Sequence, residues 1–397
     1  MTDTHDAVFL GGRELTGLPL ARYLPLQMEG VFERWLKTHI QPGSIVLDPL
    51  GTHPATVLEA AKAGYRVISC CNNPVLCFML EQLASAPTRE ELLASLSELA
   101  ASRRGGERLE QKMMALYQTE CPGCGRMVQA EAFVWEKEQQ TPVARVLNCS
   151  ACNTSGEFRV TTGDIERLAQ IGSDKLHRTR ALQRVASPGE EHYENTASAL
   201  EIYARRPLYV LFTLINRIEA LSAPPRTKQL LYMLLLPALD QGTSLWPHPP
   251  QRVRPRQLSA PPVIRENNLW AALERAVDLW AAAAATPVTI HHWPELPNAG
   301  EISLLPGRLR SLLPLPATSQ PQAVITSLPR PGQAFWTLSA IWSGWLWGRE
   351  AAAPLRSALQ RLRYDWNWHA RALRSTFATL VSQLSTDAPF FALAPEM

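Results

Sequence analysis

The chain has 397 residues, of which 46% are hydrophobic and 19% charged, and its formal net charge is +3. A charged fraction this low excludes a disordered polyelectrolyte, and the length suffices for one large core or two smaller ones. Because the charges nearly balance, the composition argues neither for nor against nucleic acid as a partner.

The N-terminal residues MTDTHDAVFLGGREL show no basic segment followed by an apolar run. The most apolar stretches, LYVLFTLI and LLYMLLLPAL, are too short to cross a bilayer. We therefore expect a cytoplasmic protein without a membrane partner. Seven cysteines, an odd number, in such a chain indicate reduced thiols or metal ligands rather than a disulfide framework.

Residues up to about 110 alternate between helical and strand patterns. A helix is expected around MEGVFERWLKTHI, a strand at SIVLDPL, a helix at ATVLEAAKAG and a strand at YRVISC. Two strands joined by one helical crossover form a parallel α/β unit. Further short strands are expected near the C-terminus, at PVTIHHW, EISLL, QAVITSL and FFALAPE.

The predicted fold class is α/β, with the sheet interrupted by two inserted segments. The first insertion consists of short segments bracketed by cysteines. The second consists of helices rich in Leu, Ala and Arg and contains one proline-rich loop that no regular element accommodates. The predicted boundaries are 1–112 for the N-terminal half of the α/β domain, 113–162 for a zinc ribbon, 163–285 for a helical insertion and 286–397 for the C-terminal half.

Two cysteine pairs carry the strongest motif of the sequence. Cys121 and Cys124 are separated by two residues, as are Cys149 and Cys152, and this spacing allows both thiolates of each pair to bind one ion. Two such pairs complete the tetrahedral four-sulfur shell that zinc prefers. Because that closed shell leaves no position for water, we expect a structural zinc ion. Gly125 follows the first pair, where the turn requires positive φ.

The stretch VLDPLGTHPATVLEAAKAGYRVISCCNNP, residues 46–74, resembles the cofactor motif of class I S-adenosylmethionine-dependent DNA methyltransferases that act on exocyclic amines. The resemblance implies a Rossmann-like sheet and an S-adenosylmethionine site. The positions that match the motif are Asp48, Pro49, Thr56, Glu59, Ala60, Gly64, Asn73 and Pro74. On this resemblance, the cofactor-binding candidates are Asp48, Pro49, Gly51, Thr52, Thr56, Cys71, Asn72 and Asn73.

The sequence departs from the family pattern where the family contacts its cofactor. Thr52 and Pro54 replace two glycines of the turn, and Cys71 occupies the position of the acidic residue that holds the ribose. Pro54 has no N–H and a fixed φ. Loss of the ribose carboxylate removes a charge-assisted hydrogen bond worth about 1.5–3 kcal/mol, although Asn72 offers a neutral substitute. We expect cofactor binding to be weak or lost.

The family's catalytic loop corresponds to Ser327, Leu328, Pro329 and Arg330. By this resemblance, Ser327 and Pro329 would contact the target amine, whereas Leu328 does not fit and Arg330 would place a positive charge beside an amine that becomes cationic. Phe335 or Trp336 is a candidate stacking platform. Most rings of AFWTLSAIWSGWLWG, including Trp342 and Trp345, are expected in the core.

The proline-rich loop contains alternate arginines, Arg252, Arg254 and Arg256. In an extended loop they point the same way and would follow phosphates, with Trp246 and His248 nearby; a solvated loop is the alternative. Asp240 and Glu266 are candidates for polar contacts, with no catalytic role assigned.

Three hypotheses remain open. The favoured one is a methyltransferase-like protein with degenerate or absent catalysis, which serves as a DNA-binding or scaffold subunit, beside an active methyltransferase or another protein partner. The second is an active amino-methyltransferase acting on adenine N6 or cytosine N4. The third is a zinc-ribbon module that binds nucleic acid, in which the α/β frame is incidental.

Overall fold

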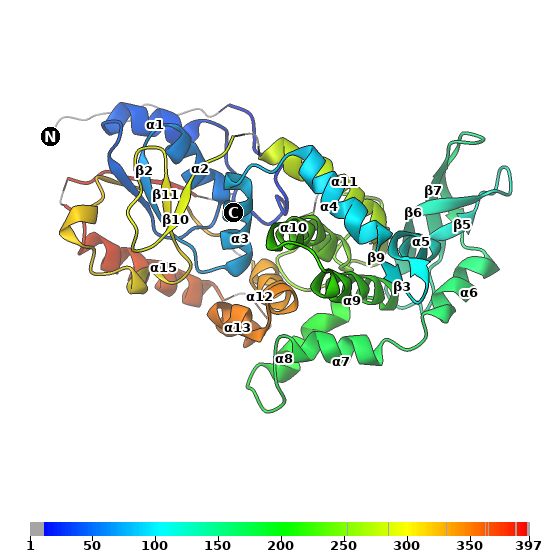
Figure 1. Cartoon of the computed structure of the whole chain (residues 1–397). Helices are drawn as coiled ribbons and strands as arrows, with labels where there is room; N and C mark the ends of the chain where they lie inside the picture. Colours follow the sequence, from blue (N-terminus) through cyan, green and yellow to red (C-terminus); the bar gives the residue numbers. More distant parts are fainter. Residues whose placement is uncertain are drawn as a thin grey trace. The chain divides into compact units, whose positions relative to one another are not determined.

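The structure is a computed structural model of the whole chain. It describes residues 12–251, 253–284, 286–330, 332–361, 363, 365–385 and 387–394, with Arg104 described by its backbone only. The chain divides into two compact units: unit 1 comprises Met1–Ala86, Ala283–Pro331 and Tyr364–Met397, and unit 2 comprises Pro87–Ala282 and Gly332–Arg363. In the colours of Figure 1, unit 1 is therefore mainly blue, yellow and red, and unit 2 is cyan, green and orange.

Unit 1 is built on a parallel six-stranded sheet with the order β10-β11-β2-β1-β12-β13. Its strands come from distant parts of the chain, since β1 and β2 precede unit 2 and the other four follow its first segment. The strands are β1 (Ile45–Asp48), β2 (Arg66–Cys70), β10 (Ile290–His292), β11 (Ile302–Leu305), β12 (Ala323–Ser327) and β13 (Phe390–Leu393).

Helices cover both faces of this sheet, which explains why its central strands are mainly apolar and almost wholly buried. All four residues of β1 and all five of β12 are buried. Helix α2 lies against β1, β2, β11 and β12, and the opposite face packs with Phe377 and Leu380 of α15. The helices of unit 1 are α1 (Val31–His39), α2 (Pro54–Lys62), α3 (Pro74–Ala84) and α15 (Trp366–Val381).

The order of the strands reverses between β1 and β12. From β1 the chain continues to β2 on one side, whereas β12 and β13 extend the sheet on the other side. In open α/β sheets, ligands bind outside the carboxyl ends of the strands at such a reversal. We call the residues at the carboxyl ends of β1 and β12 the switch point.

Unit 2 is largely helical. Helix α10 is buried from Leu230 to Asp240 apart from Tyr232. Helix α12 is mainly apolar and is buried around most of its circumference. Its longer helices are α4 (Arg89–Ala101), α9 (Arg205–Ala220), α10 (Pro225–Gln241), α11 (Leu269–Ala283) and α12 (Gln333–Trp347). Its shorter helices are α5 (Leu109–Ala115), α6 (Thr162–Gln170), α7 (Lys175–Gln183), α8 (Tyr193–Ala199), α13 (Arg349–Ala352) and α14 (Arg356–Leu359).

Unit 2 also contains an antiparallel five-stranded sheet. Four strands follow one another in sequence, and the fifth, β9, pairs with β6 from more than a hundred residues downstream. We call β5 to β8 with their connecting turns the ribbon. Its strands are β5 (Gln118–Glu120), β6 (Met127–Glu136), β7 (Ala144–Cys149) and β8 (Thr154–Arg159), and the fifth is β9 (Val263–Asn267); β3 (Arg103–Arg104) and β4 (Glu107–Arg108) form a separate short hairpin.

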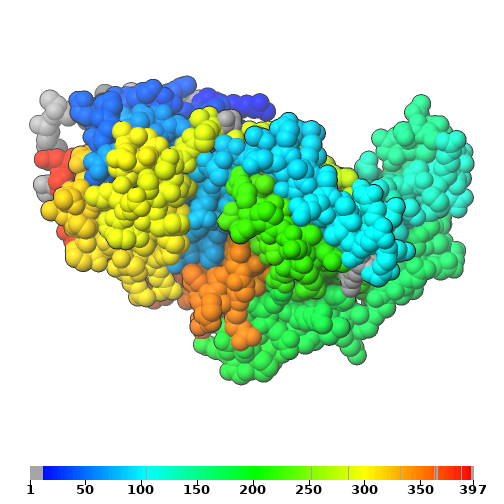
Figure 2. Space-filling model, in the orientation of Figure 1, coloured from blue at the N-terminus to red at the C-terminus, as the bar shows by residue number. Residues whose placement is uncertain are grey.

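The ribbon is visible at the end of unit 2 in both general views. Its hairpins, in cyan and green, project from the helices of that unit (Figures 1 and 2). The turn between β6 and β7 is exposed from Glu136 to Thr141, consistent with this position.

The structure confirms an α/β chain with a parallel sheet, and every strand expected in unit 1 is present. Strand β9 was not predicted, because Val263–Asn267 lies within the segment 163–285, which was expected to be helical apart from its proline-rich loop. The unit boundaries also differ from the expected segments: residues 87–112 and 332–363 belong to unit 2. The reason is packing, since α4 contacts α10 and α5, and α12 contacts α10. No helix among the described residues is both long and apolar enough to cross a membrane.

Candidate functional site

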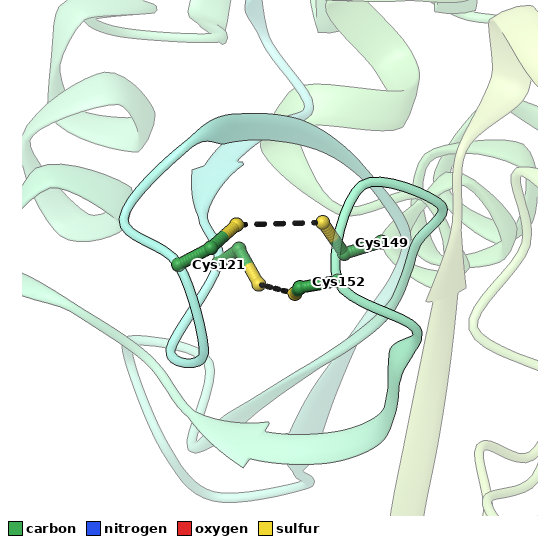
Figure 3. A group of neighbouring side chains, drawn as sticks. Cys121, Cys149 and Cys152 are labelled. Carbon is green, nitrogen blue, oxygen red and sulfur yellow. Dashed lines mark hydrogen bonds between the residues drawn. The ribbon is translucent and has the colours of Figure 1, made fainter.

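The four cysteines of the ribbon meet at one point, which we call the four-cysteine cluster. Their sulfur atoms all lie within 4.8 Å of one another. The Sγ atoms of Cys121 and Cys152 are 3.5 Å apart, and those of Cys124 and Cys149 are 3.7 Å apart. Figure 3 shows sulfur atoms from the two turns facing each other across a small gap. Four sulfurs bound tetrahedrally at about 2.3 Å from zinc would be about 3.8 Å apart, so the cluster has the size that a metal such as zinc requires.

Local backbone geometry prepares this cluster for metal. Gly125 has φ +72°, the conformation expected after the first cysteine pair, and its N–H donates to the carbonyl of Cys121. Hydrogen bonds from the hydroxyl and backbone N–H of Thr154 lower the pKa of Cys152 to about 6, whereas the neighbouring cysteines raise that of Cys124. Since the thiolate is the form that binds metal, these hydrogen bonds favour coordination.

The cluster is attached to a small apolar core on its inner side. Cys121 and Cys149 are buried with Leu147, and Val128 and Phe158 pack against them, whereas Cys124 and Cys152 are exposed. An ion held here would therefore join the buried half of the ribbon to its exposed half. This arrangement is typical of a structural site, because all four ligand positions are filled by protein.

The switch point of unit 1 brings together most of the residues expected to bind cofactor and target amine. The hydroxyl of Thr52 donates to the backbone carbonyl of Ser327, and the hydroxyls of Thr56 and Ser327 are 3.1 Å apart. Thr56 also donates to Oε1 of Gln27, at 3.0 Å. Thr52, Thr56 and Ser327 are 5%, 0% and 1% exposed. The predicted cofactor turn and the predicted catalytic loop are thus hydrogen-bonded to each other, and these polar groups satisfy one another.

Asp48 organises the turn that follows β1. Its Oδ1 accepts hydrogen bonds from the hydroxyl of Thr326 at 2.8 Å and from the N–H groups of Leu50 and Gly51 at 3.2 and 3.3 Å. Burial raises the pKa of the Asp48 carboxyl to about 6, although these hydrogen bonds oppose the rise. Asp48 is 1% exposed, so it acts on the local backbone.

Gly51 allows that turn to lie directly against the end of β2. Its φ is +55°, and a Cβ atom there would be 2.4 Å from the carbonyl oxygen of Cys70 and 2.8 Å from Cα of Cys71. The thiol of Cys71 is directed back into the protein, 3.6 Å from the carbonyl oxygen of Gly51 and 3.4 Å from that of Asn73. The position expected to hold a ribose is therefore 2% exposed and engaged internally.

The first turn of α2 carries few donors toward a ligand. Pro54 occupies the first position and has no N–H, and the side chain of His53 caps the helix by accepting from Ala55 N at 3.2 Å. The N–H of Thr56 donates to the carbonyl of His53 at 3.1 Å. Burial lowers the pKa of His53 to about 3, so its imidazole is neutral. The usual anion-binding capacity of a helix N-terminus is largely satisfied here by the chain itself.

The remaining residues predicted for the two sites have local roles or lie apart from the switch point. Asn73 caps α3 by accepting from Val75 N at 3.0 Å. Asn72 and Pro329 are half-buried, and Pro49 and Arg330 are buried. Phe335 and Trp336 are half-buried residues of α12 in unit 2. The core assignment is confirmed for Trp342 and Trp345, whose indole N–H groups donate to Tyr203 Oη at 2.7 Å and to the carbonyl of Ala181 at 3.0 Å.

The basic loop is partly built into unit 2. Arg254 and Arg256 are exposed, and the carbonyl of Arg256 accepts from the N–H groups of Gln333 and Ala334 at the start of α12, at 2.7 and 3.1 Å. Arg252 lies outside the described residues. His248 contacts Glu157 of the ribbon at 2.8 Å, and the indole N–H of Trp246 donates to the carbonyl of Asp240 at 2.9 Å.

Two residues beside the switch point were not singled out in the sequence. His53 precedes a proline at the first position of a predicted helix, which marks it as the cap position, but His is not among the preferred capping residues. Gln27 lies in an N-terminal segment without periodicity, and no sequence signal indicates its contact with Thr56.

Known proteins supply no further assignment. No protein-family model, curated protein or solved structure matches this chain.

Proposed function

We propose that this chain is a methyltransferase-like protein that has lost amine methylation and serves as a zinc-stabilised, DNA-binding subunit. Its sheet order around the switch point is compatible with a Rossmann-like ancestry, and its motif residues lie at the carboxyl ends of β1 and β12. In this proposal the α/β frame is kept for its shape and surface.

The observation that carries the proposal is the hydrogen bonding between Thr52, Thr56 and Ser327. An enzyme that uses a cofactor and a target amine keeps polar groups ready for both ligands. In this chain the hydroxyls of Thr52 and Thr56 are instead hydrogen-bonded to Ser327. To admit a ligand, the chain would have to break these contacts and leave buried partners unsatisfied, at about 1–3 kcal/mol for each group.

The zinc and DNA parts of the proposal rest on separate features. The spacing of the sulfur atoms in the four-cysteine cluster supports a structural zinc ion. The segment 247–262 contains three arginines and no acidic residue, and the attachment of Arg256 to α12 holds part of it in place. Arg254 and Arg256 are exposed, and arginines on a loop that is partly held in place are suited to phosphate contacts.

Titration calorimetry of zinc-loaded protein with S-adenosylmethionine tests the loss of cofactor binding. We expect no saturable heat up to about 1 mM cofactor, which corresponds to binding weaker than about −4 kcal/mol. Saturable binding in the micromolar range that Asp48→Ala abolishes would contradict the proposal and support the active amino-methyltransferase, with a search for its DNA substrate to follow.

Fluorescence anisotropy with a labelled duplex tests the DNA part independently. We expect affinity to fall steeply as salt rises, since phosphate contacts release counterions. Absence of DNA binding at low salt would leave only a protein-scaffold role for this chain.

A further inference from the structure

Unit 2 contains a cavity of about 540 Å³ whose wall includes a buried carboxylate, that of Glu266. The cavity is enclosed by the end of β6, the segment between α8 and α9, the residues after α10, the proline-rich loop and β9. This volume is within the range of small-molecule sites. It is remote in sequence from the switch-point motifs, and the proposed function does not use its interior, although Leu258, Ser259 and Ala260 of its wall belong to the basic loop.

Glu266 is held chiefly by one buried cation. Its residue is 4% exposed, and Oε1 lies 2.9 Å from Nε of Arg206, which is itself 1% exposed. Among the described residues, none donates a hydrogen bond of good geometry to Oε2 of Glu266, and the indole N–H of Trp135 is close enough to oppose the rise that burial causes in the pKa of this carboxyl. A buried carboxylate oxygen without a donor is costly, and in a cavity wall it is available to a ligand that brings one.

Arg206 does not extend into the cavity and is held elsewhere. Its guanidinium lies 4.0 Å from the centre of the Phe133 ring, and NH1 donates to the carbonyl of Leu116 at 3.0 Å. The pair therefore presents to the cavity a carboxylate that is ion-paired through Oε1 and can still accept a hydrogen bond at Oε2.

The rest of the wall favours a ligand that carries positive charge. Glu136 and Glu201 also line the cavity, and Lys137 is the one basic residue among its described lining residues. Trp135 supplies an aromatic wall, and Thr243 and Ser259 add hydroxyls. Acidic groups beside an aromatic ring bind organic cations through ion pairs and cation–π contacts.

We propose that this cavity binds a small organic cation of the amine or amidine class, with the Glu266 carboxylate as its acceptor and Trp135 as its aromatic contact. The site is independent of the switch point, so it stands or falls separately from the loss of methylation.

Benzamidine is a suitable probe, and its neutral isostere benzamide is the matched ligand. Calorimetry on the full-length zinc-loaded protein should show saturable benzamidine binding, with benzamide weaker by about tenfold to a hundredfold, the value of one charge-assisted hydrogen bond. Equal affinities for the two probes, or no saturable benzamidine binding at 25 °C up to about 10 mM, would overturn the proposal.

Two variants locate the bound probe. Glu266→Gln keeps the shape of the side chain and should weaken benzamidine binding by about tenfold or more. Because this change leaves Arg206 buried without its partner, the variant has a risk of unfolding, and Ser259→Trp provides a second test. Ser259 is an exposed lining residue, so an indole there should fill the cavity and abolish binding.

Gln257→Trp is the matched control for Ser259→Trp, since Gln257 is exposed on the same loop and is outside the lining residues. We expect its affinity for benzamidine to stay within about twofold of the parent, a difference below about 0.5 kcal/mol. Unchanged affinity in Ser259→Trp, or an equal loss in both variants, would exclude this cavity as the site.

Discussion

The four-cysteine cluster and the switch point are both sequence motifs with a known ligand chemistry, and they differ in what their side chains contact. In the cluster, four sulfur atoms converge at metal-binding distances and two of the cysteines remain exposed. At the switch point, Thr52 and Thr56 contact Ser327, and the thiol of Cys71 is directed toward the backbone. A motif whose ligand atoms converge on a shared gap implies a ligand, whereas a motif whose polar atoms satisfy one another implies a structural role.

The largest effect is expected at the cluster. Cys149→Ser should remove the metal and unfold the ribbon, because zinc binding contributes about 10–16 kcal/mol in small zinc modules and couples directly to folding. Metal analysis should give one zinc ion per parent chain and none in the variant, with loss of strand signal by circular dichroism. Cys77→Ser is the control: its sulfur lies in unit 1, 2.9 Å from the carbonyl of Cys71, and the variant should retain its zinc. If the parent protein were folded when purified without metal, the four-cysteine cluster would not depend on an ion and would no longer differ in this respect from the switch point.

Gly51→Ala tests the close approach of the turn to β2. The left-handed φ costs about 1–2 kcal/mol and the clash with Cys70 adds a similar amount, so we expect a loss of about 2–4 kcal/mol in the free energy of unfolding. Gly64→Ala is the matched variant, since Gly64 has φ +89° and open space around its Cβ position. This variant should lose only the cost of the left-handed φ, about 1–2 kcal/mol of the free energy of unfolding. Equal losses in urea denaturation would show that the turn does not press against the strand.

Asp48→Asn tests the internal bonding of the switch point through pH. The folded pKa of about 6 lies above the ordinary value of 3.8, so the folded state holds the proton more tightly than the unfolded chain does. The resulting stability is complete below about pH 4 and is lost as pH rises through 6, and it amounts to about 3 kcal/mol. Relative to the Asn variant, the parent should therefore lose about 3 kcal/mol of unfolding free energy between pH 4 and 7. A flat difference across this range would indicate that Asp48 is solvated.

The smallest effect is expected from the basic loop. Replacing Arg254 and Arg256 by alanine should leave stability unchanged and reduce the slope of log affinity against log salt by about 2, close to one for each phosphate contact. Arg126→Ala is the control on the ribbon, where Arg126 is exposed beside the first cysteine pair. A larger change in the control would place the DNA contact on the ribbon instead of the loop.

The sheet and the cysteine cluster were predictable because their signals are local. SIVLDPL and YRVISC are apolar runs of strand length around a helical pattern, and two-residue spacing constrains a pair of cysteines without reference to the rest of the fold. Both predictions are confirmed at the level of strands and sulfur positions.

The missed features depend on contacts between distant segments. Strand β9 is recognisable only by its pairing with β6, because VIREN alternates no more clearly than a loop. The unit boundary at residue 86 is likewise determined by the packing of α4 against α10. Hydrogen bonds such as that from Thr56 to Gln27 join residues whose spacing in the chain carries no signal.

The division of unit 1 into three stretches also affects the order of events during synthesis. Strands β1 and β2 leave the ribosome more than two hundred residues before β10 and β11, which complete their side of the sheet. At typical translation rates of about 5–20 residues per second, this delay lasts roughly 10–45 s. Throughout that interval the apolar faces of β1 and β2 lack their final neighbours, so the nascent N-terminal segment is the part of this protein most dependent on protection from aggregation.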